Sequence, residues 1–362
     1  MKSISEIDKN FAVPATVDSE NTVWYDAGEN SEEIVIYGAY SKNPYLRMPA
    51  DIAEQVSEGV AALNTNTAGI RARLACDSPY IAIRVEYESF GYSPHMTSLN
   101  QAGFDLYSAD GEECVFVKPL VPPGAISKNQ DGYVAVIKGL SGYHDYIINF
   151  PCYNDVKRLL IGVSKTAKLG KPRSYRDIAP VVFYGSSITQ GGCASRPGLI
   201  YQNYLSRWLD IDYINLGFSG NGKAEQIMAD YLAGLNMSVF VSDYDHNAPS
   251  VEHLKVTHYN LYRTIRAKNP ALPYIMISKP DYKRWVEADV IKKEIIKESY
   301  RRGIEEGDKN LYFIDGESFF GDFERFAHTV DGCHPNDLGF FKMARGIYPT
   351  LEKILGGGRV KL

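Results

Sequence analysis

Serine, histidine and aspartate, the side chains used in nucleophilic acyl transfer, occur in two short polar stretches of this sequence. Gly185-Ser186-Ser187-Ile188-Thr189 follows a short apolar run, and Asp331-Gly332-Cys333-His334-Pro335 lies near the end of the chain. A serine hydroxyl is inert at neutral pH without a base. His334 can take its proton, and Asp331 can orient and stabilise the imidazolium. The alternative for the first stretch is that its hydroxyls only cap a helix, as such residues commonly do.

Two further polar stretches can supply the hydrogen-bond donors that this chemistry needs. One is the glycine-rich segment 215–222, and the other is the cluster 243–247. A turn glycine allows a backbone N–H to approach a ligand closely, because no Cβ is in the way. The tetrahedral intermediate of acyl transfer carries negative charge on one oxygen, which N–H groups and an amide side chain stabilise. We expect Gly220 and Asn247 to provide this oxyanion hole.

All four stretches lie in the carboxy-terminal half, where short apolar runs alternate with segments of helical periodicity. The expected strands are 181–184, 213–216, 239–242, 274–278 and 311–314; the expected helices are about 197–209, 223–233, 251–268, 287–306 and from Pro335 onward. Such alternation predicts a parallel sheet with helices on both faces. Ligands of open α/β sheets bind at the carboxyl ends of the strands, which is where the polar stretches fall.

The amino-terminal half has a different pattern, with short β-branched and aromatic runs separated by turn residues. Examples are 33–37, 70–75, 80–87 and 143–150, and one helical candidate at 50–60 interrupts the series. This spacing favours an antiparallel β-sandwich, of jelly-roll-like kind, over βαβ units. The basic and polar segment 164–179 is a plausible linker. We therefore expect a β-sandwich domain at residues 1–170 and a catalytic domain at residues 171–362.

Composition indicates an ordinary globular protein and excludes several partners. The chain has 362 residues, 44% hydrophobic and 23% charged, with a formal net charge of −5. That charge gives no electrostatic reason to expect nucleic acid or an anionic membrane as a partner. No apolar run approaches the roughly 18 residues of a membrane span. Five scattered cysteines and an amino terminus without a signal-peptide core lead us to expect a cytoplasmic protein; a homo-oligomer remains open.

The four stretches resemble the sequence blocks of the SGNH (GDSL-like) hydrolase superfamily. In that resemblance Ser187 holds the nucleophile position, and Gly220 and Asn247 match the oxyanion glycine and asparagine. Asp331 and His334 match the final Asp-x-x-His block, which supplies acid and base. The resemblance implies a flavodoxin-like three-layer α/β/α hydrolase domain that works without a metal or an organic cofactor.

A fifth stretch narrows the resemblance to one branch of the superfamily. Two positions differ from the family's usual residues. Gly103-Phe104-Asp105-Leu106-Tyr107 is similar to the Gly-x-Asp-Leu-Tyr signature of the β-rich domain that precedes one branch of these esterases. Ser186 stands where the family usually has aspartate, which makes it the residue most easily mistaken for the nucleophile. Tyr244 stands where the third block usually opens with glycine, so His246 is an alternative donor to Asn247.

The resemblance implies hydrolysis of small acyl esters, often acetyl groups on sugars, as in carbohydrate acetylesterases. The substrate is then a small acyl ester or an acetylated oligosaccharide. Tyr282 and Trp285 are candidates for lining its pocket, and His246 is a further candidate for binding it. Alternatives are a lipase- or thioesterase-like enzyme for longer acyl chains and a non-catalytic carbohydrate-binding protein. An α/β-hydrolase is excluded, because its nucleophile elbow needs glycine where Thr189 stands.

One metal-dependent alternative also follows from the residues. Zinc hydrolases bind their ion through histidine and carboxylate side chains. In a zinc deacetylase of this sequence, the ligands would be Asp243, Asp245, His246 and His334. Ser187 would then have no role, and we therefore prefer the serine mechanism and expect no metal.

Overall fold

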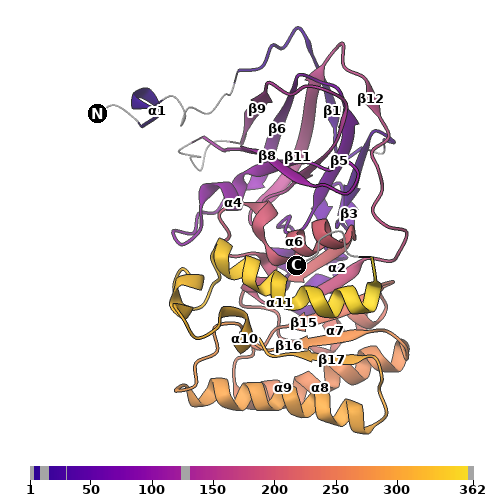
Figure 1. Cartoon of the computed structure of the whole chain (residues 1–362), viewed down its shortest axis with the longest axis vertical. Helices are drawn as coiled ribbons and strands as arrows, with labels where there is room; N and C mark the ends of the chain where they lie inside the picture. Colours follow the sequence, from indigo (N-terminus) through magenta and orange to yellow (C-terminus); the bar gives the residue numbers. More distant parts are fainter. Residues whose placement is uncertain (1–3, 9–15, 30, 124–130, 358–362) are drawn as a thin grey trace.

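The computed structural model describes residues 4–8, 16–29, 31–123 and 131–357 of the chain. Figure 1 shows two parts, a β-rich part formed by the first half of the sequence and a part with helices packed around a sheet formed by the second half. Among the described residues, no helix is both long and apolar enough to cross a membrane.

The amino-terminal half is an antiparallel sandwich, as predicted. One sheet has the order β1 (Thr22–Asp26), β11 (Asp155–Ser164), β6 (Tyr80–Ser89) and β9 (Gly132–Lys138). The other has the order β12 (Leu169–Gly170), β5 (Arg71–Cys76), β10 (His144–Asn149), β7 (Phe104–Ser108) and β8 (Val115–Leu120), and β2 (Ile34–Tyr37) also pairs with β5. The two sheets bury one apolar core between them, which includes Ile83, Leu106 and Ile148.

The short elements of this half depart from the prediction in one place. The helix expected over 50–60 is two helices, α2 (Ala50–Val56) and α3 (Glu58–Asn64). Ser57 separates them because its backbone is extended and its side chain accepts a hydrogen bond from Val60 N, which caps α3. The remaining pieces are α1 (Ile4–Ile7), the hairpin β3 (Ser41–Lys42) and β4 (Tyr45–Leu46), and α4 (Ser98–Ala102).

The carboxy-terminal half contains the predicted five-stranded parallel sheet. Its order is β14 (Tyr213–Gly217), β13 (Val181–Gly185), β15 (Val239–Asp243), β16 (Tyr274–Ile277) and β17 (Leu311–Ile314). Numbered along the chain this is the flavodoxin-like order 2-1-3-4-5. Val182 and Tyr184 of β13 face one apolar core, and Val181 and Phe183 face another, so the central strand is buried on both sides.

Helices cover both faces of this sheet. The core that contains Val182 is closed by α7 (Gln226–Ala233), α8 (Val251–Lys268) and α9 (Glu287–Glu305), with α2 and α3 of the first half packed beside them. The core that contains Val181 is closed by α6 (Tyr201–Leu209) and α11 (Asp337–Leu355). This half also contains shorter pieces: the helices α5 (Ser187–Gln190) and α10 (Glu317–Phe320) and the 3-10 turns η2 (Pro197–Leu199) and η3 (Arg325–His328).

Three helix starts lie later than the sequence indicated. The segment expected as one helix from 197 is η2 followed by α6, and α7 begins at Gln226 rather than at 223. The last helix begins at Asp337 and not at Pro335, because the side chain of Asn336 accepts a hydrogen bond from Gly339 N and caps it. The residues before Asn336 are therefore left in a turn.

Candidate active site

The predicted nucleophile lies at the carboxyl end of the central strand. Strand β13 ends at Gly185, and the one-turn helix α5 (Ser187–Gln190) starts two residues later. Strands β14 and β15 flank β13 on opposite sides, so the chain changes direction across the sheet at this point. Such a switch point is where open α/β sheets form their ligand sites.

The three hydroxyl side chains at the turn between β13 and α5 make different contacts. The Ser186 side chain is fully buried and accepts a hydrogen bond from Ile188 N, and Thr189 Oγ1 accepts one from Ser186 N. Ser187 is 9% exposed and its Oγ lies 2.9 Å from His334 Nε2. Ser186 and Thr189 therefore cap the helix, and Ser187 is the serine that contacts the predicted base.

His334 is in turn held by Asp331. Its Nδ1 lies 2.7 Å from Asp331 Oδ2, and its backbone N–H donates to Asp331 Oδ1 at 2.8 Å. Partial burial raises the pKa of Asp331, but these hydrogen bonds outweigh it and lower the pKa to about 2. Asp331 therefore stays ionised and can orient the ring and stabilise an imidazolium.

The turn that carries His334 is closed on itself. Thr329 and Pro335 form a bridge across it, and Val330 N donates to His334 O at 2.9 Å. Gly332 has a φ of +80°, which few other residues adopt readily. Because these contacts join the two ends of the turn, they fix the backbone that positions the imidazole next to Ser187.

The predicted oxyanion donors come from the ends of β14 and β15. Gly220 lies in a turn with a φ of +69°, and within the described residues its backbone N–H has no hydrogen-bond acceptor. Asn247 Nδ2 donates to Phe218 O at 2.9 Å, which places this side chain on the Gly220 turn. An amide nitrogen has two hydrogens. One proton of Asn247 thus remains for a ligand, and the role of both residues in an oxyanion hole stays a prediction.

A buried carboxylate that supports the nucleophile turn was not recognised from the sequence. Asp243, at the end of β15, accepts hydrogen bonds from Thr189 Oγ1 and from the Tyr201 hydroxyl. A Cβ at Gly185 would overlap Asp243 Oδ1, so glycine is needed for this approach. Burial raises the pKa of Asp243 to about 7. The Thr189 hydroxyl therefore connects Ser186, which caps α5, to Asp243 at the end of strand β15.

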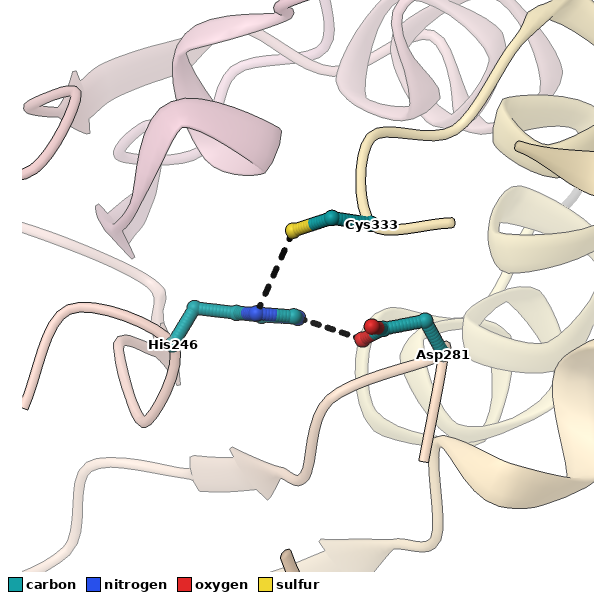
Figure 2. A group of neighbouring side chains, drawn as sticks. All are labelled: His246, Asp281 and Cys333. Atoms are coloured by element: carbon teal, nitrogen blue, oxygen red, sulfur yellow. Dashed lines mark hydrogen bonds and ion pairs between the residues drawn. The ribbon is translucent and has the colours of Figure 1, made fainter. Parts of the chain in front are cut away.

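The four side chains of the zinc hypothesis are not brought together. Asp243 contacts Thr189 and Tyr201, Asp245 Oδ2 accepts from Lys279 N, and His334 contacts Ser187. His246 pairs instead with Asp281. Over the residues described, the group with metal-ligand spacing is His246, Asp281 and Cys333 (Figure 2), a different set from the predicted one.

The two aromatic candidates for the substrate pocket lie near the turn that carries His334. Trp285 is 73% exposed and contacts the ring of Phe326, while Tyr282 stacks under the Lys293 ammonium. Both line a small cavity together with Thr329 and Gly332. Trp285 is accessible to a ligand, and Tyr282 is engaged within the protein; a role in binding stays a prediction for both.

A larger cavity belongs to the amino-terminal half, and one of its lining residues, Tyr153, lies near the predicted base. It has a volume of about 650 Å³, and its lining includes Asn66, Tyr92, Tyr153 and Asp155. A Cβ at Gly192 would lie 3.0 Å from the Tyr153 hydroxyl and 3.5 Å from His334 Cδ2. Tyr153 thus lines this cavity, and its hydroxyl and the His334 ring both lie beside Gly192. No sequence signal singled it out, because its position depends on how the two halves pack.

Two family descriptions match the chain and together cover most of it. The model of the GDSL-like Lipase/Acylhydrolase family matches residues 179–352, and the model described as the N-terminus of Esterase_SGNH_hydro-type (GxDLY) matches residues 22–169. No curated protein matches the sequence.

Solved structures resemble the chain over nearly its whole length. A candidate GDSL-like lipase from Bacteroides ovatus has 31% sequence identity and a TM-score of 0.82, and the match covers 92% of this chain and 98% of that one. The salicylyl-acyltransferase SsfX3 of a tetracycline biosynthetic pathway has 18% identity and a TM-score of 0.75, with 92% and 97% covered. An acetyl xylan esterase from Butyrivibrio proteoclasticus has 12% identity and a TM-score of 0.58, with 93% and 99% covered.

Proposed function

The chain belongs to the GDSL-like lipase/acylhydrolase family, with the β-rich GxDLY domain in front, and from this premise we propose that it is a serine esterase for small acyl esters. The preferred substrates are O-acetyl groups on carbohydrate. The observation that carries the proposal is the chain of contacts from Ser187 Oγ to His334 Nε2 at 2.9 Å and from His334 Nδ1 to Asp331 Oδ2 at 2.7 Å.

In the proposed reaction Ser187 Oγ attacks the ester carbonyl while His334 Nε2 takes the hydroxyl proton. The ionised Asp331 stabilises the imidazolium that forms. His334 then gives this proton to the leaving alcohol, which breaks the C–O bond and leaves an acyl group on Ser187. A water molecule, deprotonated by His334, attacks the acyl-enzyme and releases the carboxylic acid.

Negative charge develops on the carbonyl oxygen in both tetrahedral intermediates. We assign its stabilisation to the unengaged N–H of Gly220 and to the second amide proton of Asn247. His246 remains the alternative predicted from sequence, but both of its ring nitrogens face other side chains of the protein. Asn247 is therefore the better candidate.

Two observations favour a carbohydrate as the alcohol. The lining of the cavity beside Tyr153 includes hydroxyl, amide and carboxylate groups next to the apolar Ala62 and Met96, and these polar groups can hydrogen-bond a polyhydroxylated ligand. The fold is also similar to that of an acetyl xylan esterase. In this proposal the acyl group sits at Ser187, and the sugar extends past Tyr153 toward the amino-terminal half.

Hydrolysis of a series of p-nitrophenyl esters, followed by acetylated xylan and mannan oligomers, tests the proposal. We expect acetate to be the best acyl group, Ser187→Ala to be inactive, and EDTA to have no effect. A strong preference for octanoate or longer chains would replace the acetyl assignment by a lipase-like one. Loss of activity on chelation with recovery on adding zinc would refute the serine mechanism. Sugar binding without turnover by the wild type would indicate a carbohydrate-binding protein.

A further inference from the structure

A second histidine–carboxylate pair lies beside the proposed triad and takes no part in it. His246 Nε2 lies 2.9 Å from Asp281 Oδ1, and His246 Nδ1 lies 3.7 Å from the Cys333 Sγ. Figure 2 shows the imidazole between the thiol and the carboxylate. The three residues come from the ends of β15 and β16 and from the turn that carries His334. Their order, thiol to imidazole to carboxylate, repeats the order of the serine triad.

The histidine and the aspartate are buried together as an ion pair. Their side chains are 10% and 6% exposed. Burial lowers the pKa of His246, but the Asp281 carboxylate outweighs it and raises the pKa well above its ordinary value. The pKa of Asp281 is lowered against its own burial by His246 and Lys279. Asp281 therefore favours the protonated form of the ring once Nδ1 has taken the Cys333 proton.

Cys333 itself is accessible and immediately adjacent to the proposed base. It is partly exposed, unlike the buried Cys76 and Cys152, and its backbone N–H donates to Asp331 Oδ1 at 3.0 Å. His246 in turn directly precedes Asn247. A group attached to Cys333 Sγ would therefore lie between the turn that carries the base and the loop that carries the proposed oxyanion donor.

We propose that Cys333, His246 and Asp281 form a thiol-modification site that accepts small disulfides and that its occupation blocks the esterase. The thiolate is the nucleophile in disulfide exchange, and a neighbouring imidazolium stabilises it. The Cys333 proton passes to His246 Nδ1, the sulfur attacks one sulfur of the disulfide, and that S–S bond breaks. The leaving thiolate takes the proton from His246, so one protein mixed disulfide and one free thiol are formed. The blocking effect rests on the proposed esterase function, whereas the modification itself does not.

A metal ion is a weaker interpretation of the same residues. The ligand atoms lie within 4.8 Å of one another. However, the thiol faces Nδ1 and the carboxylate faces Nε2, on different sides of the ring. Each ring nitrogen thus already faces a protein group, and an ion bound to the ring would have to replace one of these two contacts.

The test treats the reduced full-length protein with a small excess of 2-hydroxyethyl disulfide, a small symmetric disulfide. Peptide mass spectrometry follows each cysteine, and p-nitrophenyl acetate hydrolysis follows activity. We expect Cys333 to be labelled first, activity to fall in parallel, and dithiothreitol to restore it. Cys333→Ala should hydrolyse the ester normally and resist the reagent, while the matched control Cys114→Ala, which removes another partly exposed thiol, should behave like the wild type.

Two further variants separate this inference from the esterase proposal. His246→Gln should slow the labelling of Cys333 by about tenfold or more, because the cation that stabilises the thiolate is lost. Ser187→Ala should be labelled at the wild-type rate even though it is inactive. Faster labelling of Cys114, unchanged labelling in His246→Gln, full activity of the labelled protein, or one zinc ion per purified chain that protects Cys333 would each overturn the inference.

Discussion

Asp105 and Arg196 join the two halves of the protein through a buried ion pair. Arg196 Nη1 lies 2.7 Å from Asp105 Oδ2, and the Asp105 side chain is fully buried. The same carboxylate oxygen accepts a hydrogen bond from Gly198 N, and Arg196 also contacts the Tyr107 hydroxyl. The aspartate and the tyrosine of the Gly-x-Asp-Leu-Tyr stretch thus bind the loop between α5 and α6, close to Ser187.

We therefore expect Arg196→Met to destabilise the protein by about 3 kcal/mol, because the buried Asp105 loses its cation. Urea unfolding measures this change. Adding Asp105→Asn to Arg196→Met should recover part of the loss, since no unpaired charge then remains. Strictly additive effects of the two substitutions would show that the pair is not coupled.

The two neighbouring serines should respond oppositely to replacement by alanine. Ser187→Ala should lower kcat by about 10⁴-fold or more, in the range found when a triad nucleophile is removed, with unfolding unchanged. Ser186→Ala should keep most of the turnover but lose about 1 kcal/mol of stability, because it removes the cap of α5. Kinetics and thermal unfolding of both variants check the prediction, and the reverse pattern would make Ser186 the nucleophile.

His334→Ala should lower kcat by several orders of magnitude, and Asp331→Asn should cost less, because it removes orientation and charge but leaves the base. The pKa of Asp331 is lowered to about 2, so this carboxylate loses its charge only as the pH falls through that value. Protonation of Asp331 therefore does not contribute to a change of kcat/KM between pH 5 and pH 8. Steady-state kinetics of both variants with p-nitrophenyl acetate measure the two losses. An equal or larger loss in Asp331→Asn than in His334→Ala would contradict this prediction.

Asp243 should make folding stability depend on pH. Burial raises its pKa from 3.8 to about 7 in the folded protein. Between these values the folded state keeps a proton that the unfolded chain releases, so stability is highest below the lower value and declines as the pH rises toward about 7. The slope from this one group is at most about 1.4 kcal/mol per pH unit. Unfolding of Asp243→Asn from pH 4 to pH 8 should show a flatter dependence than the wild type, and identical curves would rule out the buried carboxylate as the source.

The sequence by itself was sufficient for the fold class. Short apolar runs such as Val181–Tyr184 mark strands buried on both faces, and their alternation with helical segments predicts the parallel sheet. Helix boundaries were less accurate, because capping by Ser57 and Asn336 depends on local backbone angles that periodicity does not report. The sandwich was predicted from strand spacing, although its strand order was not.

The candidate site, too, could be predicted only in part from the sequence. Residue types and spacing were enough to select Asp331 and His334, because acyl transfer needs a base and an acid, and these two are near neighbours in one turn. The choice of Ser187 over Ser186 came from the resemblance to the family's nucleophile block. The catalytic roles of Ser187, Asp331 and His334 remain predictions. The contact between Ser187 and His334, which are 147 residues apart, required the sheet to bring two strand ends together.

Only the tertiary structure decided which polar residues support the site and which lie apart from it. Asp243, Asp245, His246 and His334 look interchangeable as ligands in the sequence, yet each has a different partner in the fold. The physical reason is that a buried polar group must find a partner, and the available partners come from distant segments. The place of Tyr153 beside the predicted base likewise follows from the packing of the two halves, which no local pattern in the chain specifies.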